Sequence, residues 1–126
     1  YPVESKISLI DLVDLGKAAA VVLTEPGYKD AVYELTATRA LTQTEVAALL
    51  SKVVEQPVVA EEIPVAKWRT QAEKAGLGGY QVETLLQMFI YYAQYGLSGN
   101  NYLLKQILGR EPHSVTAFIA REFSRH

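Results

Sequence analysis

The side chains that most often act as acids, bases or metal ligands are few and widely separated in this sequence. Only two histidines occur, His113 after a proline and His126 at the terminus. Neither has the helical spacing to a pair of carboxylates that is typical of a metal site. The adjacent Glu61 and Glu62 would point to opposite faces of a strand, so they do not form an acid–base pair. We therefore expect no metal ligands, and interpret His113 as a loop histidine and His126 as part of a frayed tail.

The residues that nucleotide-dependent hydride transfer requires are also missing. The run Gly76-Leu77-Gly78-Gly79-Tyr80-Gln81 superficially resembles a dinucleotide-binding loop. Gln81 stands where the last glycine of the G-x-G-x-x-G pattern is required, and the run follows a predicted helix instead of a strand. We interpret it as a helix stop and linker. Many NAD(P)-dependent dehydrogenases use a tyrosine with a lysine four residues later, and this spacing does not occur, since Tyr102 and Lys105 are three apart. We expect no catalytic and no cofactor-binding residue in this chain.

The most informative pattern lies in a predicted helix over residues 80–95. One of its faces has the 3.6-residue periodicity of a core stripe and consists of Val82, Leu85, Leu86, Phe89 and Ala93. A second nonpolar stripe with the same spacing consists of Met88, Tyr91, Tyr92 and Tyr95. Tyrosine combines a broad apolar ring with a hydroxyl that can orient a polar group. The second stripe either packs against the next helix, through Leu103, Leu104 and Ile107, or faces a partner or a ligand. If the second stripe faces a ligand, these four residues are the candidate substrate-binding residues.

Composition places the chain among ordinary globular domains. Its 126 residues are 49% hydrophobic, which favours a single domain over residues 1–126. A net charge of −2 supplies no cationic field for nucleic acid. No apolar run is long enough to span a membrane, and the absence of cysteine is typical of a cytoplasmic protein. We expect neither a nucleic-acid partner nor a membrane partner.

Hydrophobic periodicity and capping residues predict an α+β fold that is predominantly helical with a few short strands. Asp11 or Asp14 can cap a helix over residues 15–23 with Leu15, Ala18, Ala19 and Val22 as its buried stripe. Thr42 and Glu45 have the spacing of a capping box for the next helix. The further helices are predicted over residues 65–75 and 80–95, then up to Leu108, and finally after a cap at Ser114. Strands are predicted over residues 7–10, 31–36 and 57–63.

An ordered series of motifs resembles the NmrA-like family of atypical short-chain dehydrogenases over nearly the whole chain. The series runs from Ile7-Ser8-Leu9-Ile10-Asp11 through Tyr33-Glu34-Leu35-Thr36, Leu41-Thr42 and Glu45-Val46-Ala47, then Trp68-Arg69, Ala75-Gly76-Leu77, Met88-Phe89, Tyr91-Tyr92, Tyr95-Gly96-Leu97-Ser98-Gly99-Asn100, Gly109-Arg110-Glu111-Pro112 and Arg121-Glu122-Phe123. The aromatic part of the series looks especially like fungal members.

The resemblance implies a role for the chain. Full-length members of that family place a Rossmann domain first, bind NAD or NADP, and reduce small carbonyl, quinone or azo-type substrates or act as redox-sensing regulators. The resemblance implies that this chain corresponds to their C-terminal, substrate-side portion without the nucleotide-binding half. It also implies that the substrate region lies against Met88, Tyr91, Tyr92 and Tyr95. Whether the chain is part of an enzyme stays open. The alternative is a non-catalytic binding or regulatory module whose partner is a small molecule, a Rossmann domain or another protein. A standalone homodimer is a third possibility, since exposed apolar surface favours association.

Overall fold

The computed structural model describes residues 1–123, which contain six α-helices. They are α1 (Leu12–Thr24), α2 (Gln43–Val54), α3 (Val65–Lys74), α4 (Gly79–Tyr95), α5 (Tyr102–Leu108) and α6 (Val115–Phe123). Every predicted helix is present, with its ends within a few residues of the expected positions. His126 lies outside the described residues. The predominantly helical class is confirmed.

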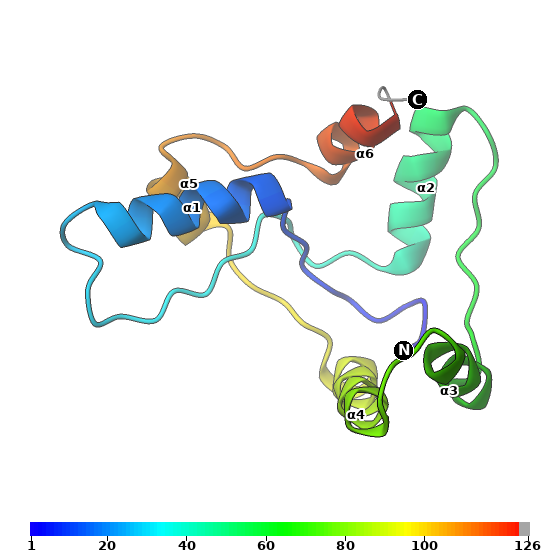
Figure 1. The fold of residues 1–126 in the computed structure, drawn as a ribbon. Coiled ribbons are helices and arrows are strands. Elements are labelled where there is room, and N and C mark those ends of the chain that lie inside the picture. Colours follow the sequence, from blue (N-terminus) through cyan, green and yellow to red (C-terminus); the bar gives the residue numbers. More distant parts are fainter. Residues whose placement is uncertain (124–126) are drawn as a thin grey trace.

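The helices pack in three pairs around the extended N-terminal segment (Figure 1). Helix α1 packs on α5, α2 on α6, and α3 on α4. The first pair buries Ala18, Leu104 and Ile107 together with Ala37. The third pair buries Ala72, Val82 and Leu86, with Trp68 and Phe89 packed beside them. The core is therefore divided into separate clusters, and residues 1–11 must hold them together.

The N-terminal segment connects the pairs mainly through its backbone. Ile7 forms an isolated antiparallel bridge with Leu41 and a parallel one with Leu97. Leu9 accepts hydrogen bonds from the backbone N–H groups of Ala37 and Thr38. One extended segment therefore joins the loop before α2 to the loop between α4 and α5.

Of the three predicted strands, only 7–10 takes part in a β-bridge among the described residues, through Ile7. Residues 31–36 and 57–63 have no regular secondary structure, and within residues 1–123 neither segment forms a ladder of backbone hydrogen bonds. Alternation in sequence gives a segment two faces, whereas a strand also needs a neighbouring strand to satisfy its N–H and C=O groups. Residues 57–63 lie along α2 instead, where Val58 exchanges hydrogen bonds with the Ser51 hydroxyl.

The predicted helix caps are confirmed. Asp11 accepts a hydrogen bond from the Val13 N–H and is the N-cap of α1. Thr42 and Glu45 form the expected capping box of α2. The Ser114 hydroxyl accepts from the Ala117 N–H at the start of α6. These interactions join residues two or three positions apart, which is why the local sequence suffices to predict them.

The predicted buried stripe of α1 is partly wrong. Ala18 is fully buried and Val22 packs against the same cluster, but Leu15 and Ala19 are exposed. The position that Leu15 was expected to fill is taken by Asp14, which has no exposed surface. A carboxylate on the buried face of a helix needs paired charges and hydrogen bonds, and these come from the other end of the chain.

Candidate functional site

The four predicted substrate-binding residues lie on α4 but differ in exposure. Tyr91 and Tyr95 are 54% and 65% exposed, whereas Met88 and Tyr92 are half-buried. The opposite face of α4 packs on α3 through Val82, Leu86 and Phe89, as predicted. Ala93, which was assigned to that core face, is exposed. Helix α4 therefore has one packed face and one aromatic face that remains accessible.

The aromatic face continues inward as a chain of ring contacts. The Tyr91 and Tyr95 rings lie 4.9 Å apart between centroids, and Tyr91 lies 6.4 Å from Tyr92. Tyr92 then contacts Tyr1 edge-on at 5.9 Å. Tyr1 in turn contacts Phe89 at the same distance. Edge-on and offset contacts are the favoured arrangements of aromatic rings, so Tyr91 and Tyr95 belong to one connected group of rings that reaches the half-buried Phe89.

The alternative in which the tyrosines pack against the following helix is wrong. Leu104 and Ile107 of α5 are buried against Ala18 of α1. Within residues 1–123, α5 forms its helix–helix contact with α1 and not with α4. No other helix of the described chain covers the aromatic face.

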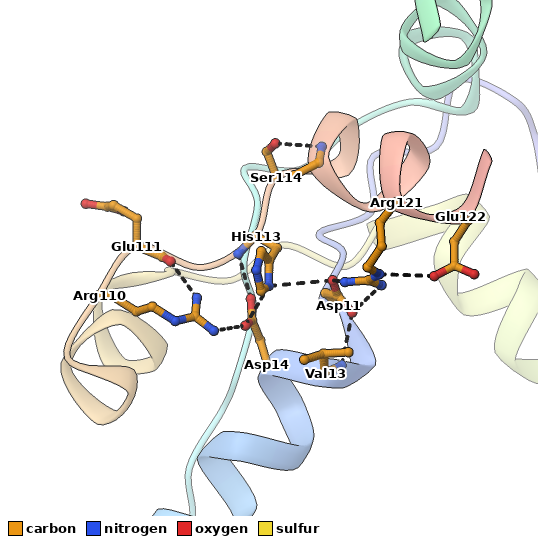
Figure 2. Close-up of polar contacts among 10 residues, drawn as sticks. Asp11, Val13, Asp14, Arg110, Glu111, His113, Ser114, Arg121 and Glu122 are labelled. Carbon is orange, nitrogen blue, oxygen red and sulfur yellow. Dashed lines mark hydrogen bonds and ion pairs between the residues drawn. The ribbon is translucent and has the colours of Figure 1, made fainter. Parts of the chain in front are cut away.

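A second group of side chains, the Asp–Arg cluster (Asp11, Asp14, Arg110, His113 and Arg121), ties α1 to the C-terminal segment (Figure 2). Arg121 of α6 donates from Nη1 to Oδ2 of Asp11 at 2.6 Å and from Nη2 to Oδ1 at 3.2 Å. A guanidinium that binds both oxygens of one carboxylate fixes orientation as well as distance. The start of α1 and the last turn of α6 are thereby held together.

Asp14 is held from the loop between α5 and α6. Arg110 donates to its Oδ1 at 2.6 Å, and the backbone N–H of His113 donates to its Oδ2 at 2.6 Å. The Nδ1 atom of the His113 ring lies 2.8 Å from Oδ1 of Asp14 and 3.7 Å from Oδ2 of Asp11. Both carboxylates therefore accept hydrogen bonds from groups of the C-terminal segment.

These contacts shift the acidity of the cluster. Hydrogen bonds from Arg121 are the main reason that the pKa of Asp11 lies below its ordinary value. Burial raises the pKa of Asp14, but the hydrogen bonds from the His113 backbone and from Arg110 outweigh burial and lower it. The same bonds to Asp11 raise the pKa of Arg121. Both aspartates are thus anions at neutral pH, and their charges are balanced by arginines.

His113 lies in a loop, as predicted, but it belongs to this cluster, which the sequence did not predict. The partners are separated by up to 110 residues, so no local spacing connects them. The available signal was Asp14 itself, which stands four residues before the buried Ala18 on the same helix face. Within residues 1–123 no group of three His, Asp or Glu side chains is arranged to hold a metal ion.

The glycine-rich run does not fit a dinucleotide. Gly76–Gly79 joins the end of α3 to the start of α4, with Gly76 in a positive-φ conformation. The N–H of Gly78 is taken up by the Gln81 side chain at 2.8 Å. A phosphate-binding loop needs a preceding strand and free N–H groups, so this run is a helix stop and linker, as predicted.

Among residues 1–123 no helix is both long and apolar enough to cross a membrane.

Two curated proteins match almost the whole chain with only part of their own length. The NAD(P)H azoreductase of Xenophilus azovorans is 26% identical over 115 residues, which cover 91% of this chain and 40% of that protein. Quinone oxidoreductase 2 of Escherichia coli (strain K12) is 25% identical over 121 residues, 96% of this chain and 42% of that protein. No protein-family model matches. The chain thus spans about two fifths of these relatives and is similar to part of NAD(P)H-dependent oxidoreductases.

Solved structures agree with this similarity. The crystal structure of the E. coli NADPH-dependent quinone oxidoreductase superposes with a TM-score of 0.78 over 95% of this chain and 44% of that one. A nucleoside-diphosphate-sugar epimerase from Staphylococcus aureus gives 0.79 at 19% identity, which shows a shared fold alone. The expected fold class is confirmed: the chain has the fold of the helical C-terminal part of an NmrA-like, Rossmann-type protein.

Proposed function

We propose that this chain is the substrate-side part of an NAD(P)H-dependent oxidoreductase and that the aromatic face of α4 forms one wall of the substrate pocket. The observation that carries the proposal is the accessible pair Tyr91 and Tyr95 on a chain that matches about two fifths of an azoreductase and a quinone oxidoreductase. Azo compounds and quinones, to which those proteins' names refer, are flat and conjugated. Flat conjugated molecules stack well on tyrosine rings.

Residues 31–36 support the presence of a further part of the enzyme. This segment has the alternation of a strand, and Val32 at its start is 99% exposed. Within residues 1–123 it forms no backbone–backbone hydrogen bond up to Thr36. Strand-like segments with open N–H and C=O groups are stabilised by adding to a sheet edge. We infer that a sheet outside these residues pairs with the segment.

NAD(P)H would be held by that further part. The residues of this chain do not fit the cofactor, because their one glycine-rich run links two helices. We therefore assign no step of hydride transfer to any side chain here. The role proposed for Tyr91 and Tyr95 is to bind and orient the substrate, together with the half-buried Met88 and Tyr92, of which Tyr92 contacts the Tyr91 ring.

Association with the rest of the enzyme also accounts for other exposed apolar side chains. Leu12 and Leu23 of α1 are largely exposed, as are Val59 and Val65 near α3. A homodimer would cover such surface in a standalone module. Sedimentation over a concentration series tests the homodimer directly, because a dimer dissociates on dilution. The fungal type indicated by the aromatic motif stays a prediction, since the relatives described above are bacterial.

The test is a titration of the chain with 2-methyl-1,4-naphthoquinone, followed by amide NMR shifts. We expect saturable shifts centred on α4 around Tyr91 and Tyr95, which are lost in the double variant Tyr91→Ala, Tyr95→Ala. The matched control is Tyr102→Ala, since Tyr102 is equally exposed at 64% but belongs to α5. Unchanged binding in the double variant, with its helical signal intact, would refute the proposed pocket wall. Unfolding of the double variant would show instead that the two tyrosines are needed for the core.

A further inference from the structure

Three aromatic rings and one carboxylate line a pocket of about 210 Å³ beside α3 and α4. The rings belong to Tyr1, Trp68 and Phe89, and the carboxylate belongs to Glu61. The pocket lies where the N-terminal segment meets this pair of helices (Figure 1). It is smaller than sites for drug-sized molecules, which measure roughly 300–1,000 Å³, so it fits a compact chemical group.

The three rings stand at steep angles to one another. Trp68 and Phe89 lie 4.9 Å apart between centroids with an interplanar angle of 83°. Tyr1 and Phe89 lie 5.9 Å apart with an angle of 61°. In edge-on contacts of this kind the rings do not cover one another as a flat stack would. Several unstacked rings around one pocket are the arrangement with which proteins bind organic cations, because the face of each ring is negative.

The carboxylate of Glu61 has no partner within residues 1–123. Its side chain is exposed and forms neither an ion pair nor a hydrogen bond there. The neighbouring Glu62 is occupied, because its Oε1 accepts a hydrogen bond from the Val3 N–H at 3.1 Å. That bond also ties the segment containing Glu61 to the N-terminal segment. Glu61 is therefore available to a cation from outside the chain, at the wall of an aromatic pocket.

The rings of the pocket are anchored by contacts outside it. The Tyr1 hydroxyl accepts a hydrogen bond from Nε2 of Gln43 at 3.3 Å, and its ring contacts Tyr92. Trp68 and Phe89 pack against the buried cluster between α3 and α4. A pocket whose walls are held by other contacts loses little entropy when a ligand binds. The rings are therefore in place before a cation arrives.

We propose that this pocket binds a small free cation that carries a trimethylammonium group, with the methyl groups against the three rings and the positive charge beside Glu61. The rings attract the charge through their negative faces, and the carboxylate adds a Coulombic attraction. The site uses neither Tyr91 nor Tyr95, so it is additional to the proposed oxidoreductase function and does not depend on it.

The lining of the pocket favours a methylated cation over a primary ammonium. An ammonium group has three N–H donors that need acceptors. Among the described side chains that line the pocket, acceptors are present only on Glu61 and Tyr1, and the Tyr1 hydroxyl already accepts one hydrogen bond. Methyl groups need no acceptor, and they find apolar surface on Ile63, Val65 and Leu86. A trimethylammonium group therefore leaves no donor unpaired.

The test is a titration with choline at constant ionic strength, followed by the fluorescence of Trp68, which is the one tryptophan of the chain. The neutral comparison is 3,3-dimethyl-1-butanol, which has the same shape with carbon in place of nitrogen. We expect a saturable change with choline and about fivefold weaker binding of the alcohol, the effect of losing a cation–π contact. Equal affinities, or no saturable change with choline, would overturn the proposal.

Two further ligands test the chemical group and its source. Ethanolamine keeps the charge but has three N–H donors, so it should bind more weakly than choline. Tighter binding of ethanolamine would contradict the selection of a methylated cation. A pentapeptide with a central Nε-trimethyllysine carries the same group on a protein side chain. Its affinity should not exceed that of choline, and binding more than tenfold tighter would show that the pocket takes a protein segment instead of a free cation.

The variant Glu61→Gln tests the carboxylate. It should weaken choline about threefold, as expected for an accessible ion pair, and should leave binding of the neutral alcohol unchanged. Glu73→Gln is the matched control, because Glu73 is also exposed and makes the same change in net charge but does not line the pocket. Unchanged choline binding in Glu61→Gln, or an equal effect of Glu73→Gln, contradicts the proposal.

Two tyrosine variants locate the cation. Tyr1→Leu removes one ring at an accessible position and should bring the affinities of choline and the alcohol to within about twofold of each other. The double variant Tyr91→Ala, Tyr95→Ala should leave choline binding unchanged. If the double variant abolishes it, the cation binds on the aromatic face of α4 and the pocket proposal fails. If the quinone does not bind on α4 but choline binds in the pocket, only the proposed substrate wall fails.

Discussion

Arg121 binds both oxygens of Asp11 across 110 residues of sequence, with Nη1 2.6 Å from Oδ2 and Nη2 3.2 Å from Oδ1. Asp11 is the N-cap of α1, and Arg121 lies in the last turn of α6. The carboxylate therefore serves a local and a long-range role at once. The Asp11–Arg121 pair and the Asp14–Arg110 pair together link the start of α1 to the C-terminal segment and position the loop that contains His113.

The first prediction concerns this pair. Arg121→Ala leaves the Asp11 carboxylate buried without its cation, and we expect the free energy of unfolding to fall by about 2 kcal/mol. Urea denaturation at pH 7 measures the change. The control is Arg39→Ala, which removes an ion pair to Glu45 at the surface and should cost less than about 0.5 kcal/mol. Equal effects of the two substitutions would show that burial does not strengthen the Asp11 pair.

The second prediction is a dependence of stability on pH. The pKa values of Asp11 and Asp14 are lower in the folded chain than in the unfolded one, so on acidification the unfolded chain takes up protons first. The contribution of the two carboxylates to stability is complete above the unfolded pKa of about 4 and is lost as the pH falls through the folded pKa values. We expect the melting temperature to decrease steeply below about pH 4.

Asp14→Asn tests the origin of that decrease. The variant should be less stable at pH 7 and should lose less further stability between pH 5 and pH 2, because one of the two titrating groups is gone. Glu83→Gln is the control, since Glu83 pairs with Arg69 at the surface and solvent weakens such pairs. If the melting temperature of Asp14→Asn falls with pH as steeply as that of the unsubstituted chain, the decrease does not come from Asp14.

The parts of the fold that the sequence predicts depend on interactions between residues that are close together in the chain. Thr42 and Glu45 specify the start of α2 by themselves, and Gly76 ends α3 because glycine tolerates the positive φ there. The core face of α4 follows from the spacing of Val82, Leu86 and Phe89. Each of these depends on residues within one or two helical turns.

Long-range pairing explains what the sequence does not predict. The segment 31–36 alternates like a strand but has no strand beside it in residues 1–123. Asp14 was weighed as a helix cap, and its burial depends on Arg110 and His113, which lie almost 100 residues away. The aromatic face of α4 was identified from spacing, while the direction of α5, which leaves that face open, was set by packing on α1.

The third prediction uses two glycines that differ in their surroundings. A Cβ atom on Gly96 would lie 2.6 Å from the backbone oxygen of Lys6, and the residue has φ of 66°. Gly96→Ala should therefore displace the Leu97 bridge to Ile7 and cost roughly 2–3 kcal/mol. Gly16→Ala is the matched control, because Gly16 lies inside α1 with no atom within 4 Å of a Cβ. It should stabilise the chain by about 0.5–1 kcal/mol, and the opposite order of the two effects would contradict the structure.

The last prediction separates cofactor binding from the rest of the proposed function. NADPH added to this chain should leave its melting temperature unchanged, because Gly76–Gly79 links two helices and offers no phosphate cradle. The positive control is E. coli quinone oxidoreductase 2, which has been crystallised with NADPH. A ligand at 100 times its Kd adds about 2.7 kcal/mol to stability, which raises a melting temperature by several degrees. A comparable increase for this chain would show a cofactor site within its own residues and would overturn the assignment of NAD(P)H to the further part of the enzyme.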